Sequence, residues 1–405
     1  MTLWLSTGLI FTFAAIALIL YKWWDVRCIG VTPVRTFTFI AILFTSGLDV
    51  GLIMFPLTEF GGYGDLSASP EYGFANPLAI EFGFWAFLIW GFYFLTCFYF
   101  AIIEPRVKFF EIPLVKVINN VVIIGTCAFT AYLLLANLPW YLPQLGDGES
   151  VVPAFYVIVF AAIGLAVYSS SKIKYVRILS IGSSVLFLTL IAGMWLRAFA
   201  LGKGSPGDFF GTVGLIGEYF SNLHHFVVPI NDYHEFYLFW WFSWSIMIGQ
   251  FTARFVSGLR TWQLLIAMLV VPSIAIGVWF TVLYHYHEQG LNIAAFTNLA
   301  MISVGVLMVV NSLDSLIRLY TDNLNLTAQR LGRANYVVFN FLAMVGLTML
   351  FQLDFLRIQW VGALVIGLYF ACFAYILANK RAQVAAIKAS PKENTLDFRK
   401  IELAS

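Results

Sequence analysis

Long apolar segments constrain this chain more than any other feature. Each holds roughly 20 residues, which is enough for a helix to cross the hydrocarbon core of a bilayer. Eleven such segments follow one another: 3–21, 34–57, 78–103, 112–138, 152–171, 176–200, 232–253, 262–284, 293–318, 334–353 and 358–379. Because 61% of the residues are hydrophobic and only 11% are charged, a soluble domain is excluded. The sequence predicts an all-α integral membrane protein.

Basic residues lie on alternate connections between these segments. Lysine and arginine mark the connections that face the cytoplasm. One set of connections and the tail carry them: Lys22, Arg27, Arg35, Arg106, Lys108, Lys116, Lys172, Lys174, Arg177, Arg254, Arg260, Arg318, Arg330, Arg333, Lys380, Arg381 and Lys388. The other connections are acidic or nearly bare, with Glu59, Asp147 and Glu288 among their charges. We therefore expect an inner (plasma) membrane protein with its N-terminus outside and its tail, 380–405, in the cytoplasm.

Two of the segments contain residues that interrupt helices. The second carries "SGLDVG" (46–51) followed by Pro56, and the seventh carries Ser243, Ser245 and Gly249 among its aromatic residues. Gly and Pro are common in membrane helices and often repack without consequence. However, interrupted helices at matching places in two halves are typical of inverted-repeat transporters with a site at the membrane midplane.

The interruptions divide the chain into two blocks of five segments. We expect a LeuT-like 5+5 inverted repeat, with a first five-helix repeat over 34–203 and a second over 232–379. Residues 1–33 then supply one extra N-terminal transmembrane helix and a loop. Between the repeats, 204–231 predicts an amphipathic helix that lies in the membrane interface.

Tryptophan is concentrated in two of the predicted spans. "FYLFWWFSWS" (236–245) contains Trp240, Trp241 and Trp244, while the third span contains Trp85, Trp90 and Tyr93. A lipid-facing belt places such rings at headgroup depth, but Trp240 to Trp244 lie roughly 8–14 Å beyond Glu235, the outer end of the span. Rings that converge from two helices instead form a cage of π-faces, which attracts a quaternary ammonium group.

The same segments resemble the betaine/choline/carnitine transporter family. "FYLFWWFSWSIMIGQFTARFVSGLRT" is similar to its most characteristic segment, and the spacing of Trp85, Trp90 and Tyr93 matches its other aromatic set. "FTSGLDVGLIMFPLTEF", "VVNSLDSLIRLYTDNL" and "SSSKIKYVRILSIGS" resemble further family motifs in the same order. The resemblance covers about residues 30–335, in a shortened member that lacks the family's first span and long tails.

The resemblance implies a substrate site and a coupling-ion site. The six aromatic residues above would bind the substrate. Na⁺ or a proton would be the coupling ion, held by Leu48, Asp49, Met308, Asn311 and Ser312. Asp49 replaces a family glycine and has three open roles: ligand of Na⁺, proton carrier, or fixed charge facing the substrate. A carboxylate that caps the following half-helix is the alternative.

These predicted sites lead to two hypotheses of function. The first is a secondary active transporter of a methylated ammonium solute, such as betaine, choline or carnitine, that works by alternating access. The alternative is a transport-inactive scaffold or receptor subunit of a larger membrane complex. Neither requires a cofactor or nucleic acid, and no enzyme motif is present. Further expected partners are the lipid bilayer and, as in relatives, the other subunits of a homotrimer.

Overall fold

Helices account for nearly the whole fold. The computed structural model describes residues 1–48, 51–293 and 295–388. Its long helices are α1 (Thr2–Trp23), α7 (Pro113–Tyr141), α8 (Pro153–Ser170), α9 (Ile173–Ala200), α12 (Asp232–Thr252), α13 (Thr261–Glu288), α14 (Ala295–Asn323), α16 (Arg333–Gln352) and α17 (Ile358–Tyr375). The remaining α-helices are α2 (Thr36–Ser46), α3 (Gly51–Gly64), α4 (Pro77–Trp85), α5 (Leu88–Phe98), α6 (Glu104–Val107), α10 (Pro206–Leu215), α11 (Gly217–Ser221), α15 (Ala328–Leu331) and α18 (Arg381–Ala385). The all-α class is confirmed.

Nine helical segments of the described chain are long and apolar enough to cross a membrane. They correspond to nine of the eleven predicted spans, so the chain is a multi-pass membrane protein. The other two predicted spans differ for identifiable reasons. One is divided into α2 and α3, and the other is α12, whose serines, tyrosines and tryptophans lower its mean hydropathy.

Helix packing repeats between two halves of the chain. Helix α9 packs on α2, and α17 packs on α12 in the same way. Helix α8 of the first half contacts α14 of the second, while α16 of the second half contacts α7 of the first. Likewise α5 packs against α12, and α13 packs against α3. This exchange of equivalent partners is the packing expected of two five-helix halves, with α1 packed outside them against α5 and α17.

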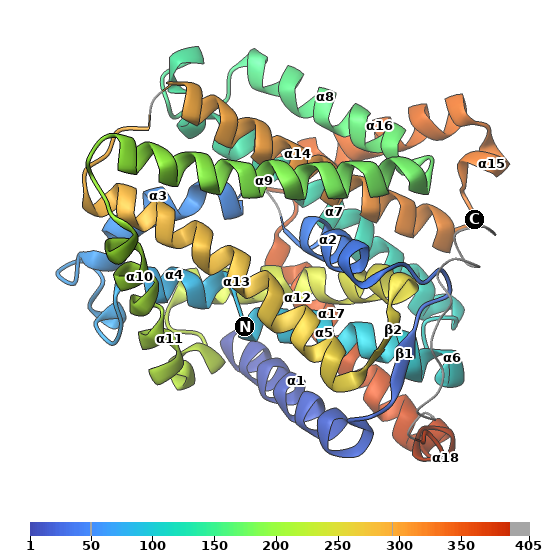
Figure 1. Ribbon diagram of the computed structural model, residues 1–405. Helices are drawn as coiled ribbons and strands as arrows, with labels where there is room; N and C mark the ends of the chain where they lie inside the picture. The colour runs from blue at the N-terminus through green and yellow to red at the C-terminus, as the bar shows by residue number, and fades with distance from the viewer. Residues whose placement is uncertain (49–50, 294, 389–405) are drawn as a thin grey trace.

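The two ends of the molecule differ in structure. At one end, β1 (Arg27–Ile29) pairs antiparallel with β2 (Ser257–Arg260), near α6 and α18 (Figure 1). At the other end, α10 and α11 cover parts of α13 and α4. The predicted amphipathic segment therefore forms short helices, with Phe210 and Phe220 exposed on them.

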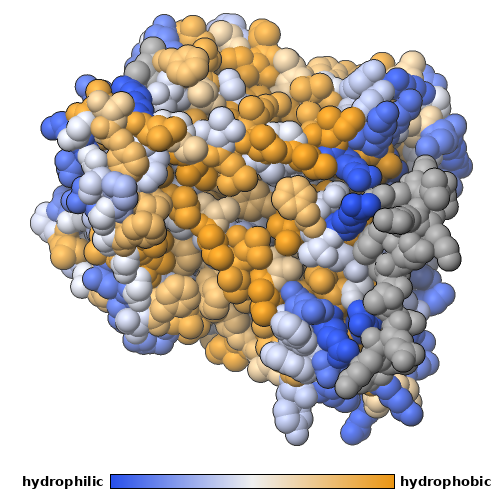
Figure 2. Space-filling model, in the orientation of Figure 1, coloured by the Kyte–Doolittle hydropathy of each residue, from blue (hydrophilic) through white to orange (hydrophobic). Residues whose placement is uncertain are grey.

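The hydropathy of the surface distinguishes the two ends of the molecule from its middle. Figure 2 shows apolar side chains across the middle of the visible face and hydrophilic side chains at its two edges. The edge near β1, α6 and α18 contains Arg106, Lys380 and Arg381, which belong to the connections predicted to face the cytoplasm. Exposed apolar residues in the middle, such as Leu188 and Leu342, face the space where lipid would lie.

Candidate functional site

Five of the six predicted substrate residues form one connected aromatic cluster. The Trp85 ring stands edge-to-face against Trp240 and Trp241, with centroid distances of 5.5 and 5.4 Å. The rings of Trp240 and Trp241 are stacked at 5.5 Å, and Tyr93 lies 6.2 Å from Trp241 and 5.3 Å from Trp90. All five side chains are almost completely buried. We call them the aromatic cluster.

Trp244 occupies a different position from the other five residues. It lies one turn beyond Trp240 on α12 and is 1% exposed. Within the described residues it makes no ring contact with the aromatic cluster. The indole N–H groups of Trp85, Trp240 and Trp244 have no hydrogen-bond partner in the described chain. Because burying an unpaired donor is unfavourable, the N–H groups of Trp240 and Trp244 are candidates for contact with a polar ligand.

A break in the third span positions Trp85. Helix α4 ends there, Ala86 is extended, and Phe87 adopts a positive φ of 50° before α5 begins. This backbone conformation is strained for a residue with a bulky side chain. The freed Phe87 N–H donates to the Ser273 hydroxyl of α13 at 2.7 Å, which holds the break in place. The sequence carries no Gly or Pro here, and we did not predict this interruption.

Two tryptophans of the aromatic cluster stabilise the end of α4. The last carbonyl groups of a helix lack partners within it. The Trp241 indole N–H donates to the Phe84 carbonyl at 2.8 Å, and the Trp90 indole N–H donates to the Trp85 carbonyl at 3.1 Å. The break and the aromatic cluster therefore stabilise each other. The break leaves carbonyl groups free at the end of α4, and the buried indole N–H groups bond to them.

The predicted interruption of the seventh span is wrong. Helix α12 continues through the tryptophan segment, since Ser243 and Ser245 donate to the carbonyl groups of Trp240 and Phe242 within the same helix. Gly249 serves packing instead. A Cβ atom there would lie 2.0 Å from the Thr96 hydroxyl of α5. Serine and glycine here allow close helix contact, as they do in many membrane proteins.

Two further aromatic residues contact the aromatic cluster, and neither was predicted from the sequence. Tyr237 lies 5.6 Å from both Trp85 and Trp240, and Phe55 of α3 lies 6.2 Å from Trp85. Tyr237 precedes Trp240 by three residues and Trp241 by four, so helical periodicity was the available signal. Nothing in the sequence near Phe55 indicated its contact.

Only some of the predicted coupling-ion residues lie close together. The Ser312 hydroxyl of α14 donates to the carbonyl groups of Leu48 and Thr45, which lie at the end of α2. Asn311 turns instead toward α9, where its amide donates to Ser183 at 2.7 Å. Met308 is fully buried on α14. Asp49 lies outside the described residues.

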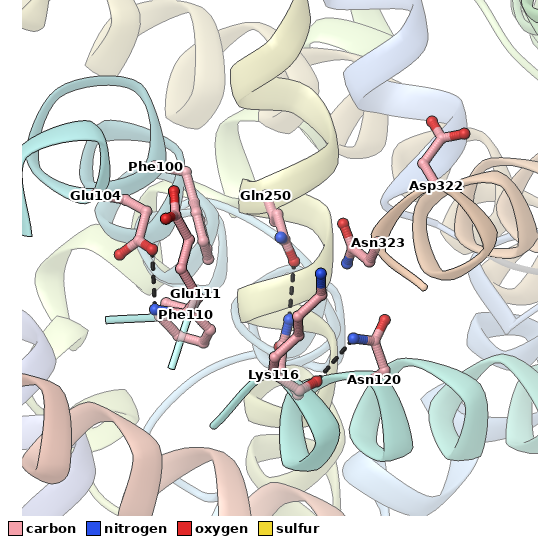
Figure 3. Close-up of a pocket in the computed structure, with 10 residues that line it drawn as sticks. Phe100, Glu104, Phe110, Glu111, Lys116, Asn120, Gln250, Asp322 and Asn323 are labelled. Carbon is pink, nitrogen blue, oxygen red and sulfur yellow. Dashed lines mark hydrogen bonds between the residues drawn. The ribbon is translucent and has the colours of Figure 1, made fainter. Parts of the chain in front are cut away.

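A cavity of about 560 Å³ lies at the β1 and α6 end of the molecule, apart from the aromatic cluster. Its lining is polar, and Figure 3 shows Asn120 donating to the Lys116 carbonyl. The Asn119 amide donates to Gln250 of α12. Asp322 of α14 lines the cavity and pairs with Arg254 at 2.8 Å. Gln250 follows Trp241 of the aromatic cluster by nine residues on α12, so this helix connects the cavity to the cluster.

Comparisons with known proteins find that the chain is similar in sequence to proteins named as betaine and choline transporters. It is 22% identical to a glycine betaine/proline/choline transporter of Vibrio parahaemolyticus over 338 residues, which cover 68% of this chain and 59% of the relative. It is 23% identical to a glycine betaine transporter of Acinetobacter baylyi, over 59% of this chain and 40% of the relative. The similarity to both relatives is low and covers part of each chain. The predicted resemblance is nonetheless confirmed.

The chain spans about half the length of these curated relatives. No family model matches it. Among solved structures, a Na⁺-coupled sialic acid symporter in an outward-open, substrate-bound state aligns over 94% of this chain and 82% of that chain, with a TM-score of 0.40 and 13% identity. The relatives carry transporter names, in line with the expectation that the chain is not an enzyme.

Proposed function

We propose that the protein is a secondary active transporter of a quaternary-ammonium or similarly methylated solute. The observation that carries the proposal is the buried aromatic cluster, in which Trp85, Tyr93 and Trp241 converge from α4, α5 and α12. A cation binds a ring face within about 6 Å of its centroid, and each desolvated contact contributes up to ~2 kcal/mol. The names of the relatives support this substrate class.

The cluster is closed in this structure, so binding requires movement. A cation held between two ring faces needs centroids roughly 8–10 Å apart, since each face lies at least 4 Å from the cation. The Trp85 and Trp241 centroids are 5.4 Å apart. The break at Ala86 and Phe87 separates Trp85 from Trp90 and allows α4 to move relative to α5. Opening at this break would admit the solute.

The two ends of the solute would meet different groups. Its methylated cation would lie against Trp85, Trp90, Tyr93 and Trp241. The unpaired indole N–H groups of Trp240 and Trp244 would orient the other end, such as the carboxylate of betaine. The cavity beyond Gln250 would be the cytoplasmic exit.

Transport would be coupled to Na⁺ or a proton at the junction of α2 and α14. The Thr45 and Leu48 carbonyl groups and the Ser312 hydroxyl supply oxygen atoms there, the ligand type that Na⁺ prefers. Leu48, Asp49, Met308, Asn311 and Ser312 remain the proposed coupling residues. The protein would lie in the inner membrane with its N-terminus outside, and a homotrimer is the proposed assembly.

A two-part experiment tests this proposal. Tryptophan fluorescence of the purified protein is titrated with betaine, choline and carnitine, with and without Na⁺. Uptake of the same labelled compounds into proteoliposomes is then measured under imposed Na⁺ or proton gradients. We expect saturable binding and gradient-driven uptake of at least one compound. Stoichiometric co-purification of partner proteins, with neither binding nor flux, would instead support the scaffold function.

A further inference from the structure

Two carboxyl groups share one tyrosine hydroxyl beside the aromatic cluster. The Tyr63 hydroxyl oxygen of α3 lies 2.7 Å from a carboxyl oxygen of Glu59, one turn away, and 2.9 Å from a carboxyl oxygen of Glu81 on α4. Glu81 is completely buried and Tyr63 is 4% exposed. Trp85 of the aromatic cluster follows Glu81 by one helical turn.

The number of protons shared by Glu59, Tyr63 and Glu81 determines whether both carboxyl groups are charged. A tyrosine hydroxyl has a single proton to donate, and its ordinary pKa of about 10 keeps it neutral at pH 7. Tyr63 therefore donates to only one of the two carboxyl groups. The contact with the other carboxyl group is a hydrogen bond only if that carboxyl itself carries a proton and donates it to Tyr63.

Hydrogen bonding identifies which carboxyl group carries the proton. Glu59 is half-buried and also accepts from the Tyr237 hydroxyl at 3.1 Å and from Tyr233. It thus has the donors that stabilise a carboxylate. Within the described chain, Glu81 forms a hydrogen bond with Tyr63 only, and its second oxygen has no partner. An unpaired oxygen is tolerable on a neutral acid but strongly unfavourable on a buried carboxylate.

Among residues 1–48, 51–293 and 295–388, no basic side chain pairs with either of the two carboxyl groups. None of the ion pairs within the described residues involves Glu59 or Glu81. The Trp85 indole N–H faces Glu81 and lacks a hydrogen-bond partner in the same part of the chain. The titratable side chains of the 3-10 helix η1 (Pro70–Tyr72), α12 and α13 that contact side chains of α3 or α4 are Tyr72, Tyr233, His234, Tyr237, Tyr284 and His287, with Glu71 next to Tyr72. Most of them are tyrosines, and His234 stacks on Phe84.

We propose that Glu59, Tyr63 and Glu81 form a proton-binding site, in which Glu81 carries the proton while the aromatic cluster is closed. The site joins α3 and α4 to α12, because Tyr233 and Tyr237 of α12 donate to Glu59. Tyr237 also contacts Trp85 and Trp240. Loss of the proton leaves two carboxylates around one hydroxyl without a cation, and their repulsion would separate α3 from α4 beside the cluster.

Infrared difference spectroscopy tests proton binding without any substrate. The wild-type protein in vesicles at neutral pH is compared with Glu81→Gln, Glu59→Gln and the exposed neighbour Glu71→Gln. We expect the band of a protonated carboxyl group to be lost in Glu81→Gln only. An unchanged band in Glu81→Gln, or its loss in Glu59→Gln instead, overturns the proposal.

Tyr63→Phe gives a second test that does not depend on the folding of Glu81→Gln. Removing the hydroxyl deprives the Glu81 proton of its acceptor, so the carboxyl band should shift in frequency. A band that keeps its wild-type frequency contradicts the assignment. Thermal unfolding in detergent checks that each variant is folded.

The effect on transport rests on the proposed function. In proteoliposomes, wild-type uptake should vary with external pH between about 5 and 8, whereas uptake by Glu81→Gln should be independent of pH over that range. A wild-type pH dependence that persists in Glu81→Gln contradicts a gating role for the proton. Absence of any wild-type uptake would refute the proposed function, and the infrared result would still decide the proton site.

Discussion

At the residue scale, Trp241 offers the most direct test of whether the aromatic cluster binds a cation. It contacts Trp85, Tyr93 and Trp240, and we expect Trp241→Ala to weaken betaine or choline binding about 30-fold, since one desolvated cation–π contact contributes up to ~2 kcal/mol. Isothermal titration calorimetry measures the change. Trp241→Phe keeps a ring and should lose less affinity.

Trp140→Ala is the matched control for this substitution. Trp140 is 64% exposed on α7 and lies outside the aromatic cluster, so its loss should leave affinity unchanged. Equal affinities for the wild type and Trp241→Ala would contradict the cage. Equal losses in Trp241→Ala and Trp140→Ala would show a general effect on folding.

Ser312 tests the coupling site at the same scale. Ser312→Ala removes one oxygen from the junction of α2 and α14 while leaving the Thr45 and Leu48 carbonyl groups. If Na⁺ binds there, the Na⁺ concentration for half-maximal uptake should rise about tenfold, because one charge-assisted contact contributes about 1.4 kcal/mol. Ser303→Ala, on an exposed face of α14, serves as control. Unchanged Na⁺ dependence would remove Ser312 from the site.

At the element scale, α12 is held by unusually close helix contacts. A Cβ atom at Gly362 of α17 would lie 2.3 Å from the Phe239 carbonyl oxygen of α12, which is backbone and has little freedom to move. We expect Gly362→Ala to destabilise the protein by about 1–3 kcal/mol. Thermal unfolding in detergent should show a lower Tm.

Gly346 of α16 provides the comparison for Gly362. A Cβ atom there meets nothing within 4 Å, so Gly346→Ala should be neutral or stabilise the helix by about 0.5–1 kcal/mol. Similar Tm values for both variants would show that the α12–α17 contact has room that the structure does not indicate.

At the scale of the whole molecule, the predicted orientation can be tested with thiol labelling. Cys28, Cys97, Cys127 and Cys372 are all free and buried, so the natural chain should react little with an impermeant reagent. We expect exposed Glu149→Cys to react in intact cells and Lys388→Cys to react only after permeabilisation. The opposite pattern would reverse the topology.

The sequence determined the membrane class, most spans and the aromatic set, because length, hydropathy and helical spacing are local properties. It also predicted that the second span divides near Gly47. Gly and Ser alone do not define a break, however. In α12 the serines bond to their own helix and Gly249 makes room for α5, so the predicted interruption was wrong.

Only the tertiary structure decided where the third span breaks and which groups meet. No Gly or Pro at Ala86 and Phe87 indicates a helix break. Their conformation is held by Ser273 of α13 and by the indole N–H groups that bond to the last carbonyl groups of α4. The meeting of Glu59, Tyr63 and Glu81 likewise joins residues from two helices. Such pairings depend on helix packing, which lies beyond the reach of local sequence patterns.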